Sequence, residues 1–125
     1  MIPPEFPENQ GDAVGHLYDI AQAQTYLSQA GYPSGAGFPE ITLVSNEGHE
    51  DIIEYIAEEW RTALNIPVQT EYYPWGEYLN MLNDCRDDPT YCTYDIFRLG
   101  WMVDYNDADN ILNTLFHPDS EHNRL

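Results

Sequence analysis

At 125 residues, the chain is long enough for one compact domain with its own hydrophobic core and too short for two. Its 22 acidic side chains stand against four arginines and no lysine, which gives a net charge of −18 at pH 7. That charge repels phosphate backbones and anionic lipid surfaces, so the composition argues against nucleic acid as a partner. A solvated surface that aids solubility is the simpler interpretation of the acidity, and a surface that attracts cations is the alternative.

The sequence contains no run of about 18 apolar residues, so no membrane-spanning segment is predicted. Residues 1–5 lack the basic start and the apolar stretch of a secretion signal. If the native protein is exported, we expect its export signal to be missing from this sequence.

Residues 1–17 are predicted to form an extended lead-in, because the first 15 contain three prolines, two glycines and no periodic pattern. A helix is predicted to follow, with Asp19 as its N-cap and Gln22 in the capping-box position. Gly31 is expected to end this helix, since glycine readily adopts the left-handed conformation beyond a helix C-terminus.

From about residue 41 onward, β-branched runs alternate with patterns of helical period. Strands are predicted at residues 41–45, 68–72 and 94–99. Helices are predicted at residues 50–64, from Pro74 to about residue 82, and from about Asp107 with Ile111, Leu112, Leu115 and Phe116 buried. The order strand, helix, strand, helix, strand makes two consecutive βαβ units, which predicts the α/β class with a largely parallel sheet.

Only three strands are visible, whereas a parallel sheet normally has both faces covered by helices. We therefore expect the sheet to continue in sequence that is absent here. The chain is interpreted as a segment of a longer protein.

Cys85 and Cys92 stand seven positions apart, and the stretch between them contains Asp-Asp-Pro, which favours a turn. In an oxidising compartment this loop predicts a disulfide, which stabilises the fold by roughly 2–3 kcal/mol through loop closure. Two unrelated free thiols are the alternative. Two cysteines without further ligands give little support to a zinc site.

Ligands of open parallel sheets usually bind beyond the carboxyl ends of the strands. Three stretches satisfy this rule, at residues 45–48, 72–75 and 100–105. The last is the richest, because Trp101 offers a stacking face and Asp104 offers a carboxylate.

Each candidate has a plainer interpretation. Trp75 and Trp101 are equally well explained as core aromatic residues, and Asp107 and Asp109 as charges favoured by the dipole at a helix start. Asp104 is harder to explain in this way, because it lies between a predicted strand end and a predicted helix start without being an obvious cap.

No motif indicates catalysis or a cofactor. Residues 104–115 begin like a calcium-binding loop, but the sixth position is Asp109 instead of glycine and the twelfth is Leu115 instead of glutamate. The sequence has no His-Glu-x-x-His helix, no Gly-x-Ser-x-Gly elbow and no phosphate-binding glycine loop. We therefore predict no catalytic residue, no metal site and no cofactor.

Three segments resemble, in order, signatures of the peptide-class solute-binding proteins that serve ABC transporters. Residues 18–33 resemble the "YDP-x-KA-x-x-LL-x-x-AGYP" segment of this family. Residues 56–68 resemble the helix and the "lGI-x-V" strand that follow it, and residues 94–105 are similar to the "YD…GW-x-ADY" signature near the family's cleft. One departure is Asp107-Ala108, where many members have Asp-Pro.

The resemblance implies a two-lobed, periplasmic-binding-protein-like fold several times longer than this chain, with residues 18–125 as part of the C-terminal lobe. In the oligopeptide-binding members, the aspartate of the "DY" motif pairs with the ligand's α-ammonium, a role that would fall on Asp104. The tryptophans that match Trp101 and Trp75 line side-chain pockets in the same cleft, and Tyr105 of the "DY" motif is the fourth candidate ligand residue.

The implied function is that of the substrate-binding component of an ABC importer, which captures oligopeptides or a similar small solute and delivers them to a membrane permease. The implied location is periplasmic or extracellular, with a lipid anchor as one option for the full-length protein. An oligosaccharide ligand is the alternative within the class. A carboxylate-pair glycoside hydrolase and a calcium-dependent adhesion module are the alternatives outside it.

Overall fold

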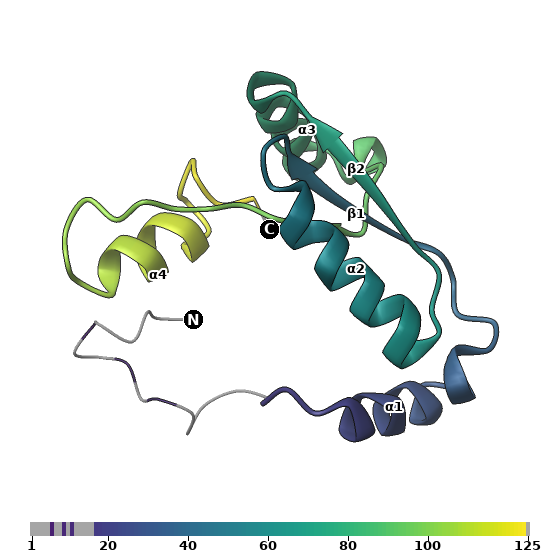
Figure 1. Cartoon of the computed structure of the whole chain (residues 1–125). Coiled ribbons are helices and arrows are strands. Elements are labelled where there is room, and N and C mark those ends of the chain that lie inside the picture. The colour runs from purple at the N-terminus through teal and green to yellow at the C-terminus, as the bar shows by residue number, and fades with distance from the viewer. Residues whose placement is uncertain (1–5, 7–8, 10, 12–16, 125) are drawn as a thin grey trace. The chain divides into compact units, whose positions relative to one another are not determined.

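The computed structural model describes residues 6, 9, 11 and 17–124. The chain divides into two compact units, the sheet unit (Tyr18–Leu99) and the α4 unit (Met1–Leu17 with Gly100–Leu125). Each is described by itself (Figure 1). Most of the lead-in predicted at residues 1–17 lies outside the described residues.

The sheet unit is built on three parallel strands, β1 (Ile41–Asn46), β2 (Val68–Tyr73) and β3 (Ile96–Phe97). Their order is β2-β1-β3, so β1 is the central strand. It pairs with β2 along its whole length and with β3 at Leu43 and Val44. The predicted α/β class with a parallel sheet is confirmed.

The third strand is shorter than the predicted residues 94–99, because a side chain takes over part of the pairing. The Asp95 backbone N–H donates to the Thr42 carbonyl at 3.0 Å, and the Thr42 N–H donates in return to the Asp95 carboxylate at 2.8 Å. A carboxylate therefore replaces a strand carbonyl as the acceptor, and the regular ladder begins only at Ile96.

Helices α2 (Glu50–Leu64) and α3 (Trp75–Asp87) cover opposite faces of the sheet (Figure 1). Adjacent residues of a strand point to opposite faces. Leu43 accordingly packs in one core cluster with residues of α2, whereas Val44 packs in another with residues of α3. The chain crosses from β1 to β2 on one side and then from β2 back past β1 to β3 on the other. Because such crossovers are generally right-handed, two that run in opposite directions place their helices on opposite faces of the sheet.

Helix α1 (Ile20–Gln29) is capped as predicted. The Asp19 carboxylate accepts a hydrogen bond from the Gln22 N–H at 2.9 Å, and the helix ends at Ala30 before Gly31, whose φ is +96°. No residue of α1 is buried. Leu27 of α1 packs against the core cluster to which α2 contributes, and the Gln24 amide donates a hydrogen bond to the Ala63 carbonyl of α2 at 2.8 Å.

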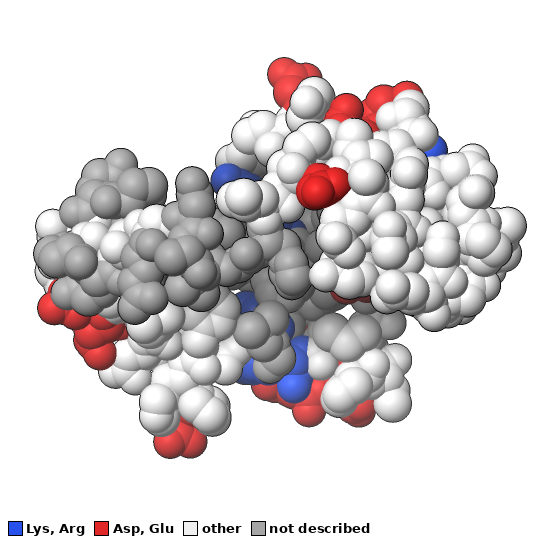
Figure 2. Space-filling view, turned by 90° about the horizontal axis from the view of Figure 1, so that it is seen from below, with Lys and Arg blue, Asp and Glu red and all other residues white. Residues whose placement is uncertain are grey.

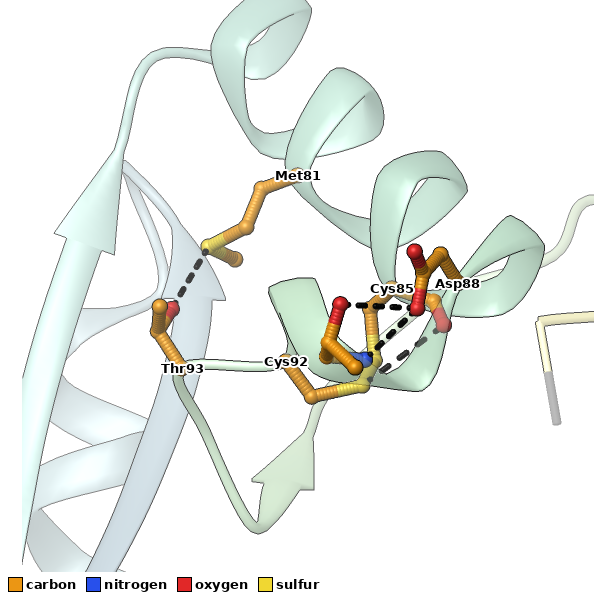
Figure 3. The surroundings of a disulfide bond; sticks show 6 residues. Met81, Cys85, Asp88, Cys92 and Thr93 are labelled. Carbon is orange, nitrogen blue, oxygen red and sulfur yellow. Dashed lines mark hydrogen bonds between the residues drawn. A yellow bond between two sulfur atoms is a disulfide. The ribbon is translucent and has the colours of Figure 1, made fainter.

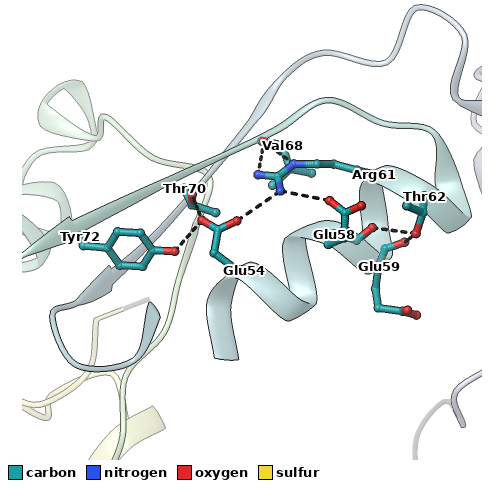
Figure 4. A network of polar contacts seen from close by, with 8 residues as sticks. All are labelled: Glu54, Glu58, Glu59, Arg61, Thr62, Val68, Thr70 and Tyr72. Carbon is teal, nitrogen blue, oxygen red and sulfur yellow. Dashed lines mark hydrogen bonds and ion pairs between the residues drawn. The ribbon is translucent and has the colours of Figure 1, made fainter. Parts of the chain in front are cut away.

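A polar network around Arg61 joins α2 to the start of β2 (Figure 4). The guanidinium donates twice to the Val68 carbonyl, at 3.0 and 2.9 Å, and lies 3.3 Å from the Glu54 carboxylate. Hydrogen bonds to Glu54 from the hydroxyls of Thr70 and Tyr72 and from Arg61 hold the pKa of this carboxyl below its usual range. The network therefore fixes the helix against the strand that it precedes.

Helix α4 (Asp109–Phe116) begins two residues after the predicted Asp107, because the Asp107 carboxylate accepts a hydrogen bond from the Asp109 N–H at 2.9 Å, ahead of the first turn. The prediction that Leu112 and Phe116 are buried is wrong: each is 46% exposed. Buried positions of α4 are Asn110 and Ile111, and Leu115 is half-buried. The apolar pattern in the sequence therefore predicted the helix correctly, but it did not predict which residues of the helix are buried within the α4 unit.

Cys85 and Cys92 are joined by a disulfide, with Cα atoms 4.6 Å apart (Figure 3). Cys85 lies in the last turn of α3, and Cys92 directly follows a 3₁₀ turn, η3 (Pro89–Tyr91), which Asp88 caps through the Thr90 N–H. The bond therefore links the end of α3 to the loop before β3, rather than to the strand itself.

Removing this disulfide is predicted to lower the stability of the full-length protein by about 2–3 kcal/mol, because a short loop loses its covalent closure. The measurement is thermal or urea denaturation of a Cys85→Ser/Cys92→Ser variant beside the parent protein. Reductant should destabilise the parent and leave the variant unchanged. Two free thiols in the unreduced parent would refute the pairing.

Gly35 allows the α1–β1 connection to pass close to the end of α2. Its φ is +75°, and a Cβ atom at this position would lie against the backbone carbonyl oxygens of Leu64 and Asn65. The same approach is held by a hydrogen bond from the Asn65 amide to the Ser34 carbonyl at 2.9 Å.

Gly35→Ala is therefore predicted to destabilise the protein more than Gly37→Ala, its matched control. Gly37 has φ +77° with open space around the Cβ position, so its substitution carries only the left-handed backbone cost of about 1–2 kcal/mol. The steric overlap at Gly35 adds about 1–3 kcal/mol. Equal destabilisation of the two variants in urea denaturation would show that no close approach exists.

Candidate functional site

The carboxyl edge of the sheet brings together the residues that follow β1, β2 and β3. The strands are parallel, so Asn46, Tyr73 and Phe97 end at the same edge. Hydrogen bonds continue just beyond it, from the Glu47 N–H to the Tyr73 carbonyl and from the Arg98 N–H to the Val44 carbonyl, both at 3.0 Å. This is the edge at which open parallel sheets usually bind ligands.

Tyr78 of α3 fixes the backbone at this edge from beneath. Its side chain is fully buried, and its hydroxyl donates to the carbonyl of Arg98 at 2.6 Å and lies 3.3 Å from that of Val44. Burial raises the pKa of Tyr78 to about 12, so the phenol remains a hydrogen-bond donor at neutral pH. One buried side chain therefore bridges Val44 of β1 and Arg98, the residue that follows β3.

Arg98 is a candidate functional residue that the sequence reasoning missed. Of the four arginines, it is the one that directly follows a strand at this edge, and it is half-buried. Its guanidinium lies 3.5 Å from the side-chain oxygen of Asn46. The available signal was the rarity of basic residues: an arginine at a strand end is unusual in so acidic a chain.

Trp75, a predicted ligand residue, is the first residue of α3 and is separated from the end of β2 only by Pro74. It is 52% exposed in this chain. Its ring lies 6.4 Å from that of Tyr78, centroid to centroid. An indole face is thus available to a ligand at the carboxyl edge of the sheet unit.

The other three predicted ligand residues lie in the α4 unit, in the loop before α4. Trp101 is half-buried, and its indole N–H donates to the side-chain oxygen of Asn110 at 2.8 Å. The ring of His122 lies 5.1 Å from the Trp101 ring at an interplanar angle of 51°. Asn110 of α4 therefore holds the indole through its N–H, and His122, in the segment that follows α4, packs against the indole ring.

Asp104 is exposed, and only its backbone is tied down. Its N–H lies 3.4 Å from the same oxygen of Asn110. Within the described part of the chain, no hydrogen bond or ion pair involves the Asp104 carboxylate. This carboxylate is therefore open to a cationic ligand group.

Tyr105 is 47% exposed, and its hydroxyl donates to the Asp109 carboxylate at 2.7 Å. That bond raises the pKa of Tyr105 above its usual value. Asp109 is more than a helix-start charge, because it holds a candidate ligand residue. The structure thus brings Trp101, Asp104 and Tyr105 together around the first turn of α4, while Trp75 belongs to the sheet unit.

Acidic side chains stand in several separate places on the face shown in Figure 2. The described residues contain no group of three or more His, Cys, Asp or Glu side chains that could hold a metal ion. No helix within the described ranges has the length and apolarity needed to cross a membrane.

Comparison with known proteins gives a family match over nearly the whole chain. Residues 1–123 match the model of the bacterial extracellular solute-binding proteins, family 5 Middle. The periplasmic murein peptide-binding protein MppA of Escherichia coli (strain K12) is 33% identical over 98 residues, which cover 76% of this chain and 17% of MppA.

Two solved structures are similar in fold as well as in sequence. A periplasmic oligopeptide-binding protein of Borrelia burgdorferi matches with a TM-score of 0.70 and 30% identity, covering 90% of this chain and 21% of that one. The ABC transporter-associated periplasmic binding protein DppA of Helicobacter pylori, in complex with the peptide STSA, matches with a TM-score of 0.68 and 27% identity, covering 92% of this chain and 21% of that one.

These relatives are named as binding proteins of the periplasm, and the chain spans about a fifth of the length of those it matches. It is therefore a portion of a larger protein with a periplasmic-binding-protein fold. The chain belongs to the bacterial extracellular solute-binding proteins of family 5.

Proposed function

We propose that the full-length protein is the substrate-binding component of an ABC importer and that it captures peptides without changing them chemically. The observation that carries this proposal is the family match over residues 1–123, combined with an exposed, unpaired carboxylate beside aromatic side chains at residues 101–105. The relatives whose names state a ligand include murein peptide-binding and oligopeptide-binding proteins. The described residues add no constellation that would favour hydrolysis over binding.

Asp104 is assigned to the α-ammonium group of the peptide. A carboxylate that is exposed in the absence of ligand carries little desolvation cost until the ligand arrives. When the ligand then excludes water, the charge-assisted hydrogen bond becomes strong. Trp101 and Tyr105 of the α4 unit and Trp75 of the sheet unit are each assigned to the wall of a side-chain pocket, since each presents aromatic surface.

Arg98 is assigned to a ligand carboxylate at the carboxyl edge of the sheet unit. It is half-buried at the carboxyl edge of the sheet, with its backbone held by Tyr78 and its guanidinium near the Asn46 amide. A guanidinium matches the geometry of a carboxylate better than any other side chain.

The full-length protein is further proposed to act in the periplasm or outside the cell, where a membrane permease receives the ligand. Residues 18–125 are proposed to form part of its C-terminal lobe. A disulfide at Cys85–Cys92 fits an oxidising compartment. A lipid anchor is one way in which such a protein is retained at the membrane.

Asp104→Ala is predicted to weaken binding of a peptide with a free N-terminus sharply, because it leaves a buried ammonium without its partner. Loss of one member of such a pair costs about 2–5 kcal/mol, or roughly 30- to several-thousand-fold in affinity. Isothermal calorimetry on the full-length protein measures this loss. The same peptide with an acetylated N-terminus should respond far less to the substitution.

Asp119→Ala is the matched control, since the Asp119 side chain is 93% exposed in the same unit. It should change the affinity for either peptide little. Asp109 is unsuitable as a control because it holds Tyr105. Equal small losses for Asp104→Ala and Asp119→Ala would reduce Asp104 to a solvated surface residue.

Arg98→Gln is predicted to weaken a peptide acid at least about tenfold while affecting the corresponding C-terminal amide little, because only the acid offers a carboxylate to the guanidinium. The comparison uses the same calorimetry on both ligands. Arg86→Gln serves as the control, because Arg86 lies at the far end of α3 beside Asp87. An equal loss for acid and amide would show that Arg98 supports the fold rather than the ligand carboxylate.

A further inference from the structure

We propose that Asn110 is a positioning residue for the ligand, since its one buried side-chain oxygen holds both the Trp101 indole and the Asp104 backbone. This inference rests on the proposed function of the loop at residues 101–105. It adds a residue that touches no ligand and that nothing in the sequence marked as functional.

The geometry of the two contacts defines the role. Asn110 is the second residue of α4 and is 2% exposed. It accepts from the Trp101 indole N–H at 2.8 Å and lies 3.4 Å from the Asp104 N–H. Both partners are obligate donors, so the atom between them is the carbonyl oxygen of the amide, which has two lone pairs to offer.

The loop has few other means of holding its shape. Between the two contacts, Met102 is 87% exposed and Val103 is 39% exposed, so the intervening residues are not anchored by burial. The Asn110 side-chain oxygen therefore fixes the spacing between the Trp101 indole and the backbone of Asp104, the residue proposed to bind the ligand's ammonium group. Such preorganisation reduces the entropic cost of ordering the loop when a ligand binds.

The first turn of α4 supports the whole group of candidate ligand residues. Asp109, the residue before Asn110, accepts from the Tyr105 hydroxyl at 2.7 Å. The helix itself is tied to the loop through the Asn110 N–H, which donates to the Asp107 carbonyl at 3.1 Å. Two adjacent helix residues thus hold Trp101, Asp104 and Tyr105, and Asn110 is the one that does so from a buried position.

The test uses the full-length protein and the peptide pair with free and acetylated N-termini. Asn110→Leu keeps the approximate size of the side chain and removes the acceptor, whereas Asn110→Asp keeps an acceptor for both donors. We expect Asn110→Leu to lower the affinity for the free peptide at least about tenfold more than for the acetylated one. The separate variant Asn110→Asp should keep the affinity for the free peptide within about threefold of that of the parent protein.

A general structural role would give a different pattern, because loss of fold weakens both peptides equally. An unchanged ratio of the two affinities in Asn110→Leu overturns the proposal. If that variant fails to fold, Asn110→Ala provides the same comparison with a smaller side chain.

Asp104→Ala separates this inference from the proposed function. If Asn110 acts through Asp104, adding Asn110→Leu to Asp104→Ala should cause little further loss for the free peptide, and the two effects should be non-additive. Additive losses overturn the positioning role while leaving the function standing. A protein in which Asp104→Ala has no effect on the free peptide instead overturns the function on which the inference rests.

Discussion

The sheet unit depends on the position of β1 between two parallel partners. A central parallel strand must have both of its faces covered, and the adjacent residues Leu43 and Val44 meet this requirement by packing against α2 and α3 respectively. The two crossovers then leave all three carboxyl ends at one edge. Tyr78 completes the arrangement from the interior, because its buried hydroxyl links Val44 of β1 to Arg98, the residue that follows β3.

The candidate ligand residues are held in place in two different ways. Trp75 and Arg98 are placed by the sheet itself, because Trp75 comes two residues after the end of β2 and Arg98 directly follows β3. Trp101, Asp104 and Tyr105 are placed by hydrogen bonds to the first turn of α4. The first set depends on core packing and the second on a few polar contacts, so substitutions near α4 should affect binding with less effect on the fold.

Much of the sheet unit was predictable from sequence, because the relevant signals are local. The β-branched runs before and after α2 and the capping pattern at Asp19 each lie within a few residues. The start of β3 was not predictable, since it depends on whether the Asp95 carboxylate or a strand carbonyl meets the Thr42 N–H across 53 residues. The exposure of Leu112 and Phe116 likewise depends on what covers α4, which an apolar pattern does not reveal.

The candidate site likewise contains residues that local sequence signals predict and residues that only distant contacts reveal. Trp101, Asp104, Tyr105 and Trp75 were predicted from their places beyond strand ends and from the family signature. Arg98 and Asn110 were not, because the contacts that make them candidates form only once β1, β3 and α4 are in place.

The central claim, that the full-length protein binds peptides, is tested most directly by native mass spectrometry of the protein purified without denaturation, followed by identification of whatever it releases. The account predicts released peptides with free N-termini. Release of an oligosaccharide or another ligand without an ammonium group would contradict it.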